Sequence, residues 1–238
     1  MVRLHSSHPF GMYQRGLRAP LTGMSERIGR VRQLSRGPGD PGEAVPTAST
    51  VRQARDRLGG RDRLLAALES GSLVQLWSGV VVPAELAHDP VTRAEAALLR
   101  AGSGAVLSGT TALAMHGCRA ADSRTTHVTV PYHRQLRRES GLVVRQGRVR
   151  EREVVELDGL RAQVLDVALT EVLCTAEEQL AVACLRQATA LPDVELGRGL
   201  WAMVEQRLVR RSDRRGTRRA RSLLEAVRAP GRVTSLPA

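Results

Sequence analysis

Residues 105–131 read AVLSGTTALAMHGCRAADSRTTHVTVP, and this stretch decides the fold class. It opens as an apolar strand, and Ser108 then stands where a helix N-cap accepts a hydrogen bond from a free backbone amide. The helix ends at Gly117, which can adopt the left-handed conformation of a C-terminal cap. Residues 127–130 alternate polar and apolar side chains, as a half-buried strand does, and Pro131 ends them. The stretch therefore predicts a strand, a helix and a second strand in close succession.

The residues before this stretch predict a compact helix-turn-helix unit. A cap at Ser49 or Thr50 starts a helix that runs to Leu58, and after a Gly-Gly turn a second helix covers 61–70. Residues 73–82 then predict a hairpin with a tight turn. Two helices followed by a hairpin is the order of a winged helix-turn-helix.

The rest of the chain predicts a mixed domain that ends in helices. A helix is expected at 91–100, and two further strands at 141–144 and 153–157. From Val164 the apolar pattern becomes helical, and a last helical run covers 199–227. The predicted fold class is therefore α+β, with a small N-terminal winged helix-turn-helix followed by a mixed α/β domain ending in helices.

Composition divides the chain into four parts. The first is rich in Gly, Pro, Ser and Arg, and it cannot bury enough surface to offset its ordering entropy. Met12 and Met24 are alternative translation starts within it. The helix-turn-helix unit is too small to be stable alone, so it should pack on the residues that follow it or on a helix at 25–34. The parts are a disordered basic arm at 1–46, the winged helix-turn-helix-like domain at 47–88, the α/β domain at 89–206, and an arginine-rich C-terminal helix and tail at 207–238.

Two blocks of the chain resemble the AbiEi family, the antitoxins of type IV toxin–antitoxin systems. The family pattern is Leu-Ser-His-x-x-Ala-Ala-x-x-Leu-His-Gly, a variable loop, and His-Val-Thr-Val-Pro. This chain departs from it at Gly109, where the family carries histidine. The matching residues are Leu107, Ser108, Ala112, Ala114, His116, Gly117 and His127 to Pro131. Weaker similarity covers the hairpin at 77–81, the segment 164–168 and the arginine-rich segment 216–224.

The resemblance implies a DNA-binding protein. Members begin with a winged helix-turn-helix that recognises inverted repeats upstream of their own operon. Their second domain assists DNA binding and antagonises a nucleotidyltransferase toxin. Many relatives carry arginine at the wing tip, whereas this chain has Ser78 and Gly79 there.

The positive charge of the chain is concentrated at its two ends. All 36 basic residues are arginines, and the net charge is +12. Residues 1–46 carry +4 and residues 207–238 carry +8, so the body between them is neutral overall. A basic end suits a polyanion such as nucleic acid. Because the absence of lysine indicates a GC-rich genome, a solvated arginine-rich tail is the alternative interpretation.

Eight arginines are the candidate DNA contacts. The second helix of a helix-turn-helix faces base edges with its first residues, which assigns base reading to Arg61 and Arg63. Arg52 and Arg55 on the first helix can reach phosphates. Acidic residues are interspersed in this unit, so the alternative is a helix-turn-helix scaffold that does not bind DNA. At the other end, helical spacing predicts one stripe along a phosphate backbone, formed by Arg207, Arg211, Arg214 and Arg218.

The histidines and cysteines show no metal or catalytic pattern. Cys118, Cys174 and Cys184 give an odd count without a C-x-x-C pair, which indicates buried free thiols in a reducing compartment. His116 and His127 are interpreted as structural, either bonded to each other or with His116 capping the end of its helix. No P-loop, nucleophile elbow, zinc-protease or dinucleotide motif is present. We therefore predict a non-enzyme with no cofactor and no metal.

The leading hypothesis is an AbiEi-like antitoxin and transcriptional repressor that binds its own operator in double-stranded DNA. The chain has neither an apolar leader nor a run of membrane-spanning length, so we expect a cytoplasmic protein that does not bind membranes. The alternatives are an orphan protein- or RNA-interaction module that has lost operator binding, or a nuclease-family relative lacking its catalytic domain.

Overall fold

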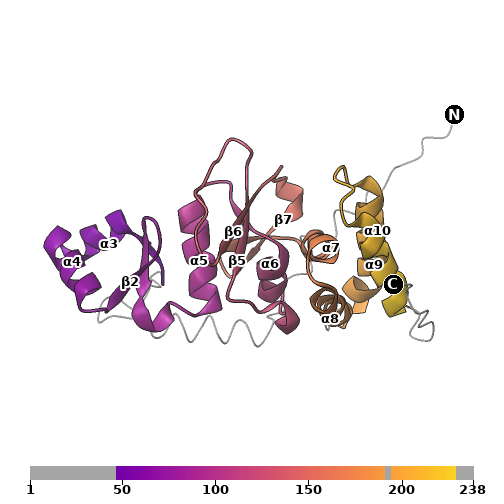
Figure 1. The fold of residues 1–238 in the computed structure, drawn as a ribbon, viewed down its shortest axis with the longest axis horizontal. Helices are drawn as coiled ribbons and strands as arrows, with labels where there is room; N and C mark the ends of the chain where they lie inside the picture. The colour runs from indigo at the N-terminus through magenta and orange to yellow at the C-terminus, as the bar shows by residue number, and fades with distance from the viewer. Residues whose placement is uncertain (1–46, 191–193, 229–238) are drawn as a thin grey trace.

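The computed structural model describes residues 47–190 and 194–228, and the side chains of 47–190 and 199–228. The predicted basic arm at 1–46 and the helix at 25–34 lie outside these residues. The described chain is elongated. Figure 1 shows short helices and a hairpin at one end, a sheet with its covering helices in the middle, and a group of helices at the other end.

The N-terminal unit has the predicted order of elements. Helices α3 (Val51–Leu58) and α4 (Arg61–Glu69) precede a hairpin of β2 (Leu73–Trp77) and β3 (Val80–Pro83). A short strand that the sequence did not predict, β1 (Ser49–Thr50), pairs with β3, which gives an antiparallel sheet in the order β1-β3-β2.

Local sequence signals explain this unit. The Thr50 side chain accepts from the Gln53 backbone N–H at 3.2 Å, and the Gln53 side chain accepts from the Thr50 N–H at 2.9 Å. This reciprocal capping box starts α3. Gly59, with φ of 78°, ends it in the left-handed conformation. Ala54 and Leu64 pack with Val81 in a small hydrophobic cluster.

The central sheet has five strands in the order β6-β5-β4-β8-β7. The central strand β4 runs antiparallel to its neighbour β5 and parallel to its other neighbour β8. β5 and β6 are parallel, and β7 and β8 are antiparallel. Strand β8 was not predicted, because only four residues form it and two of them are polar. The strands are β4 (Val106–Leu107), β5 (Thr126–Val130), β6 (Leu142–Gln146), β7 (Val154–Leu157) and β8 (Leu160–Gln163).

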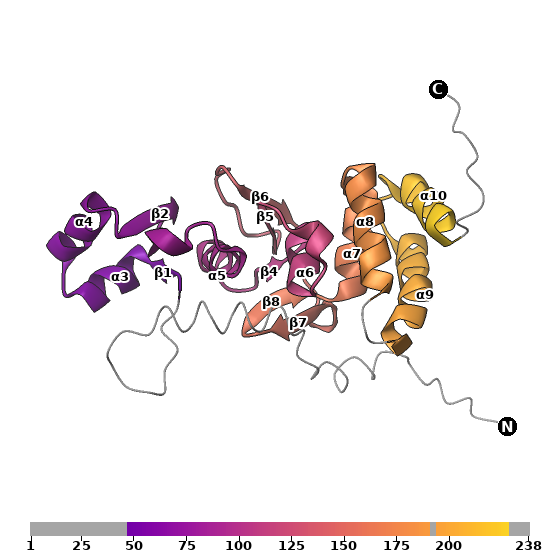
Figure 2. The same ribbon diagram turned by 90° about the horizontal axis from the view of Figure 1, so that it is seen from below.

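Helices cover both faces of this sheet. Figure 2 shows α5 (Pro90–Ala101) on the face toward the N-terminal unit and α6 (Gly109–Met115) on the other face, between the sheet and α7. Strand β5 is consequently buried on both sides, and Thr126 and Thr129 are buried as well. The strand predicted at 127–130 is therefore confirmed as β5, but the half burial expected from its polar–apolar alternation is wrong.

The start of α6 also differs from the prediction. Ser108 occupies the N-cap position, but its hydroxyl makes no capping hydrogen bond and is buried without a partner. The Gly109 N–H donates to the side-chain oxygen of Gln163 at 3.2 Å instead. β8 lies beside β4, so Gln163 at its end meets the first turn of α6. The predicted end of this helix is confirmed, because Gly117 has a φ of 90°.

The C-terminal third is helical. The predicted single run over 199–227 is wrong, because residues 211–216 form a turn between two helices. Within that turn Asp213 pairs with Arg215 at 3.1 Å, and Gly216 has a φ of 72°. The helices are α7 (Leu165–Thr175), α8 (Glu178–Thr189), α9 (Val194–Arg210) and α10 (Thr217–Arg228).

One hydrophobic core connects the described elements from the hairpin to α10, while α3 and α4 pack on Val81 in the separate small cluster. The core runs from Trp77 and Val80 of the hairpin, through α5 and the sheet, to Leu224 of α10. The predicted packing of the small N-terminal unit on the residues that follow it is confirmed. Among the described residues, no helix is both long and apolar enough to cross a membrane.

Candidate nucleic-acid interface

The predicted base-reading arginines lie at the exposed start of α4. Gly60 precedes the helix and provides no side-chain cap, so no side chain caps the first amides of α4, where Arg61, Asp62 and Arg63 are exposed. Both arginines are exposed, while Leu64 turns into the small cluster of the unit. The Arg63 guanidinium donates to the Leu58 carbonyl at 3.3 Å. The start of α4 thus combines uncapped amides with two cations.

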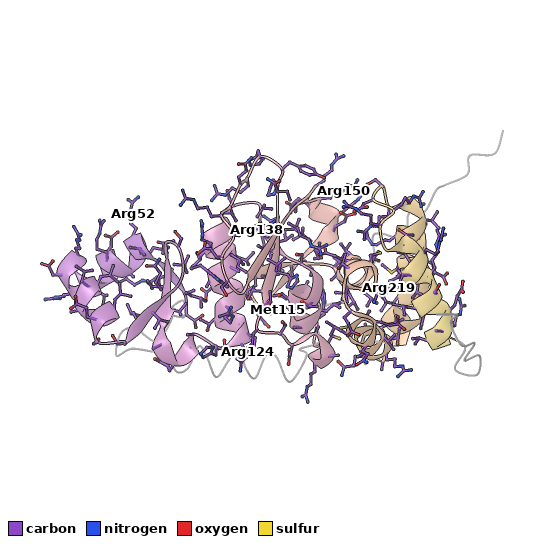
Figure 3. The ribbon with its side chains drawn as sticks, viewed as in Figure 1. Arg52, Met115, Arg124, Arg138, Arg150 and Arg219 are labelled. Atoms are coloured by element: carbon purple, nitrogen blue, oxygen red, sulfur yellow. The ribbon has the colours of Figure 1, made fainter. Side chains whose placement is uncertain are left out.

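Helix α3 contributes one arginine that is loosely paired and one that is closely paired with the same carboxylate. The Arg52 side chain is 86% exposed and has only a 4.0 Å contact with Asp56. Figure 3 shows it projecting away from the N-terminal unit. Arg55 is half exposed and pairs with Asp56 at 3.0 Å. An exposed pair of this kind contributes little energy, so a phosphate can compete with Asp56 for Arg55.

Arg207 has an internal role in place of the predicted phosphate contact. Its Nε donates to Asp166, which is buried at the start of α7, and its Nη1 contacts Glu153 at 3.1 Å. Burial by itself would lower the pKa of Arg207, but the two carboxylates raise it above its ordinary value. Arg207 therefore joins α9 to α7 and to the segment before β7.

The other three predicted arginines of the C-terminal cluster lie on different elements. Arg211 is mostly buried and donates to the Asp213 carbonyl at 2.8 Å, and Arg214 donates to the Val209 carbonyl at 3.2 Å. Arg218 is exposed on α10. The predicted stripe is therefore not formed, because its members are divided between α9, the turn and α10.

The two predicted arginine clusters lie at opposite ends of the molecule. Figure 3 labels Arg52 at one end and Arg219, on α10, at the other, with the whole sheet between them. The sequence missed a third group of exposed arginines in the loops between them. These are Arg137, Arg138, Arg148 and Arg150. Loop arginines have no helical spacing, so periodicity gave no signal for them.

The two histidines of the AbiEi-like block have separate environments. His116 donates through Nε2 to the Gln163 carbonyl at 2.8 Å, rather than bonding His127 or capping its own helix. Burial lowers the pKa of His116, although that hydrogen bond and Asp166 partly oppose it. Burial and, to a smaller extent, Arg145 lower the pKa of His127. His116 is therefore neutral and ties α6 to the end of β8.

All three cysteines are free and buried, as predicted. Cys174 lies on α7 and Cys184 on α8. The Cys118 thiol donates to the Cys184 backbone carbonyl at 3.7 Å, and the interaction of the two thiols lowers the pKa of Cys118 and raises that of Cys184. Among the described residues, no group of histidine, cysteine and acidic side chains could hold a metal ion.

A cavity of about 520 Å³ lies at the start of α5. Arginine and histidine side chains face it together with a single carboxylate. The residues that line it are His88, Pro90, Arg93, Asp122, Ser123 and Arg124. Figure 3 shows Arg124 on the side of the molecule away from Arg52 and Arg138, so this cavity is separate from the exposed arginines of α3 and α4.

The comparisons with known proteins give only distant structural likeness. No protein-family model and no curated protein matches the chain. Among solved structures, the chain is similar to the crystal structure of the RV2827C protein from Mycobacterium tuberculosis. The sequence identity is 19% and the TM-score 0.44, over 92% of this chain and 84% of that one.

Proposed function

We propose that this chain is a winged-helix DNA-binding protein that acts as an AbiEi-like antitoxin and represses its own operon. The observation that carries the proposal is the start of α4. Its uncapped amides and the exposed Arg61 and Arg63 follow a tight turn after α3 and precede a two-stranded wing. In a helix-turn-helix, this is the position that enters the major groove.

The remaining contacts follow from the same orientation. With α4 in the groove, Arg52 and Arg55 on α3 are placed to contact the phosphate backbone, which fixes the register without reading sequence. Arg214 and Arg218, at the end of the molecule opposite α4, supply positive charge for a second contact with the phosphate backbone of a longer DNA site. The three reduced thiols suit the cytoplasm, which is where we place this activity.

The test is fluorescence anisotropy of the full chain on the duplex from upstream of its own gene, with an unrelated duplex of equal length and a salt series. We expect a preference of about a thousandfold or more for the upstream duplex. Arg61→Ala/Arg63→Ala should remove that preference. The control is Arg119→Ala/Arg186→Ala, which removes the same charge from η3 (Arg119–Ala121) and α8. Unchanged operator affinity in the α4 variant would show that α4 is not the reading helix.

A second candidate function is a protein- or RNA-interaction module without operator specificity. The observation that favours it is the exposed apolar surface of α4, where Leu65 is 42% exposed, together with a wing tip that carries no arginine. Equal and steeply salt-dependent binding to both duplexes would support this candidate. Antagonism of a toxin is tested separately, by co-expressing the chain with an adjacent nucleotidyltransferase and measuring growth.

A further inference from the structure

The loop between β5 and β6 is held firmly against the wing. β5 and β6 are parallel neighbours, so residues 131–141 must return along the sheet to begin β6. The side chain of Gln146 donates to the Tyr132 and Arg134 carbonyls at 3.2 and 2.8 Å, which fixes the start of the loop. Arg134 in turn donates to the Ala101 carbonyl at 2.9 Å.

The end of the loop meets the tip of the wing. The Glu139 carboxylate accepts from the Ser78 backbone N–H at 2.6 Å and from Arg100 on α5 at 2.7 Å. The Trp77 indole N–H donates to the Ser140 carbonyl at 3.0 Å. Burial would raise the pKa of Glu139, but the hydrogen bonds from Ser78 and Arg100 lower it below its ordinary value. A charged carboxylate therefore ties the loop to the turn of the hairpin.

Two unpaired cations directly precede this carboxylate. Arg137 and Arg138 are exposed, and neither forms an ion pair within the part of the chain whose side chains are described. The wing turn beside them, at Ser78 and Gly79, is uncharged. Figure 3 shows Arg138 in the central part of the molecule, between Arg52 and the C-terminal helices. The loop thus brings positive charge to a wing that has none.

We propose that Arg137 and Arg138 form a composite wing with the β2–β3 turn and bind the phosphate backbone of duplex DNA next to the groove that α4 enters. This inference rests on the proposed DNA binding and adds a contact to it. A wing normally reaches the backbone beside the recognition helix with its own tip. Here the tip anchors the loop, because the Ser78 N–H donates to Glu139, and the loop provides the guanidinium groups. The contact is to phosphate, so it raises affinity for every duplex alike.

The test compares Arg137→Ala/Arg138→Ala with the control pair Arg119→Ala/Arg186→Ala, in the full chain, on the upstream and the unrelated duplex. We expect affinity to fall about tenfold on both duplexes. The slope of log K against log salt should become shallower by nearly 2, since each phosphate contact contributes about 0.9. The control pair should change both the affinity and the salt slope much less. An equal effect of the two variants would overturn the composite wing, because it would show only a general loss of charge.

A second variant separates position from charge. Glu139→Gln makes the chain more positive by one unit but weakens the acceptor for Ser78 and Arg100. If only net charge matters, this variant binds DNA more tightly, which overturns the proposal. We expect weaker binding, with an unchanged far-ultraviolet circular dichroism spectrum. Wild-type chain that binds neither duplex would overturn both this inference and the proposed function. Wild-type chain that binds while both loop variants match it would overturn this inference alone.

Discussion

The Arg207 guanidinium on α9 is ion-paired with the Asp166 carboxylate at the start of α7, where the Asp166 side chain is only 2% exposed. The same guanidinium contacts Glu153 at 3.1 Å. One cation therefore bridges two carboxylates from two other elements. This arrangement fixes the position of α9, and it explains why an arginine in the most basic part of the chain is not available to DNA.

Replacing Arg207 should destabilise the fold strongly. Arg207→Ala leaves the Asp166 charge buried without its partner, and we expect the free energy of unfolding to fall by about 3–5 kcal/mol. Urea denaturation measures this. Arg210→Ala on the same helix is the control, because Arg210 is exposed and its loss should change stability by about 0.5 kcal/mol or less. Similar effects of the two variants would contradict an internal role for Arg207.

The N-terminal unit could be predicted from sequence because its signals are local. The Thr50 cap, the Gly59–Gly60 turn and the hairpin each depend on residues only a few positions apart. Arg207 could not be assigned in this way, since its partners lie 41 and 54 positions earlier in the chain. Helical spacing shows which residues share a face of one continuous helix. It does not show that the helix ends at Arg210.

The surroundings of Gln163 illustrate the same limit. This residue lies at the end of the unpredicted strand β8. It accepts from the Gly109 N–H at 3.2 Å through its side chain and from His116 at 2.8 Å through its backbone carbonyl. It therefore performs the capping role that the sequence assigned to Ser108. Only the pairing of β4 with β8 brings it there, and that pairing leaves no local pattern.

Gly216 should be intolerant of any side chain. A Cβ at this position would lie 2.0 Å from the Cys174 carbonyl oxygen, and the φ of +72° is strained for other residues. We expect Gly216→Ala to lower the free energy of unfolding by about 2 kcal/mol or more. Gly71→Ala is the matched control, because its φ is +73° and its Cβ would meet nothing within 4 Å. The control should cost about 1 kcal/mol. Equal costs would show that the close packing of α10 on α7 is not rigid.

The three thiols should be protected in the folded chain. Cys118 and Cys184 have no exposed surface, and burial is the main cause of the raised pKa of Cys174. Burial denies the reagent access to Cys118 and Cys184, and the raised pKa keeps Cys174 in the unreactive thiol form, so we expect almost no reaction with a disulfide reagent at pH 8. Three equivalents should react after denaturation in urea. Rapid reaction of one thiol in the native chain would contradict the packing of α7 and α8 described above.

The stability of the fold should decrease in mild acid, with His116 as a main cause. Burial lowers the pKa of this imidazole below its ordinary value of 6.5, because the folded chain holds the neutral form. The unfolded chain takes up a proton as the pH falls through about 6.5, while the folded chain does not. The contribution of His116 is therefore fully present above that pH and is lost as the pH falls toward the folded pKa. The slope is up to about 1.4 kcal/mol per pH unit for each such group.

Urea denaturation of the wild type and of His116→Gln between pH 7.5 and 5.5 measures this dependence. His127 adds to the wild-type slope in the same direction, because its pKa is also lowered. His116→Gln keeps an N–H donor for the Gln163 carbonyl but removes the titrating group, so its stability should vary less with pH. His133→Gln, at an exposed position in the loop, is the control and should retain the wild-type slope. An unaltered slope in His116→Gln would mean that His116 is accessible to protons in the folded chain, which its hydrogen bond between α6 and β8 excludes.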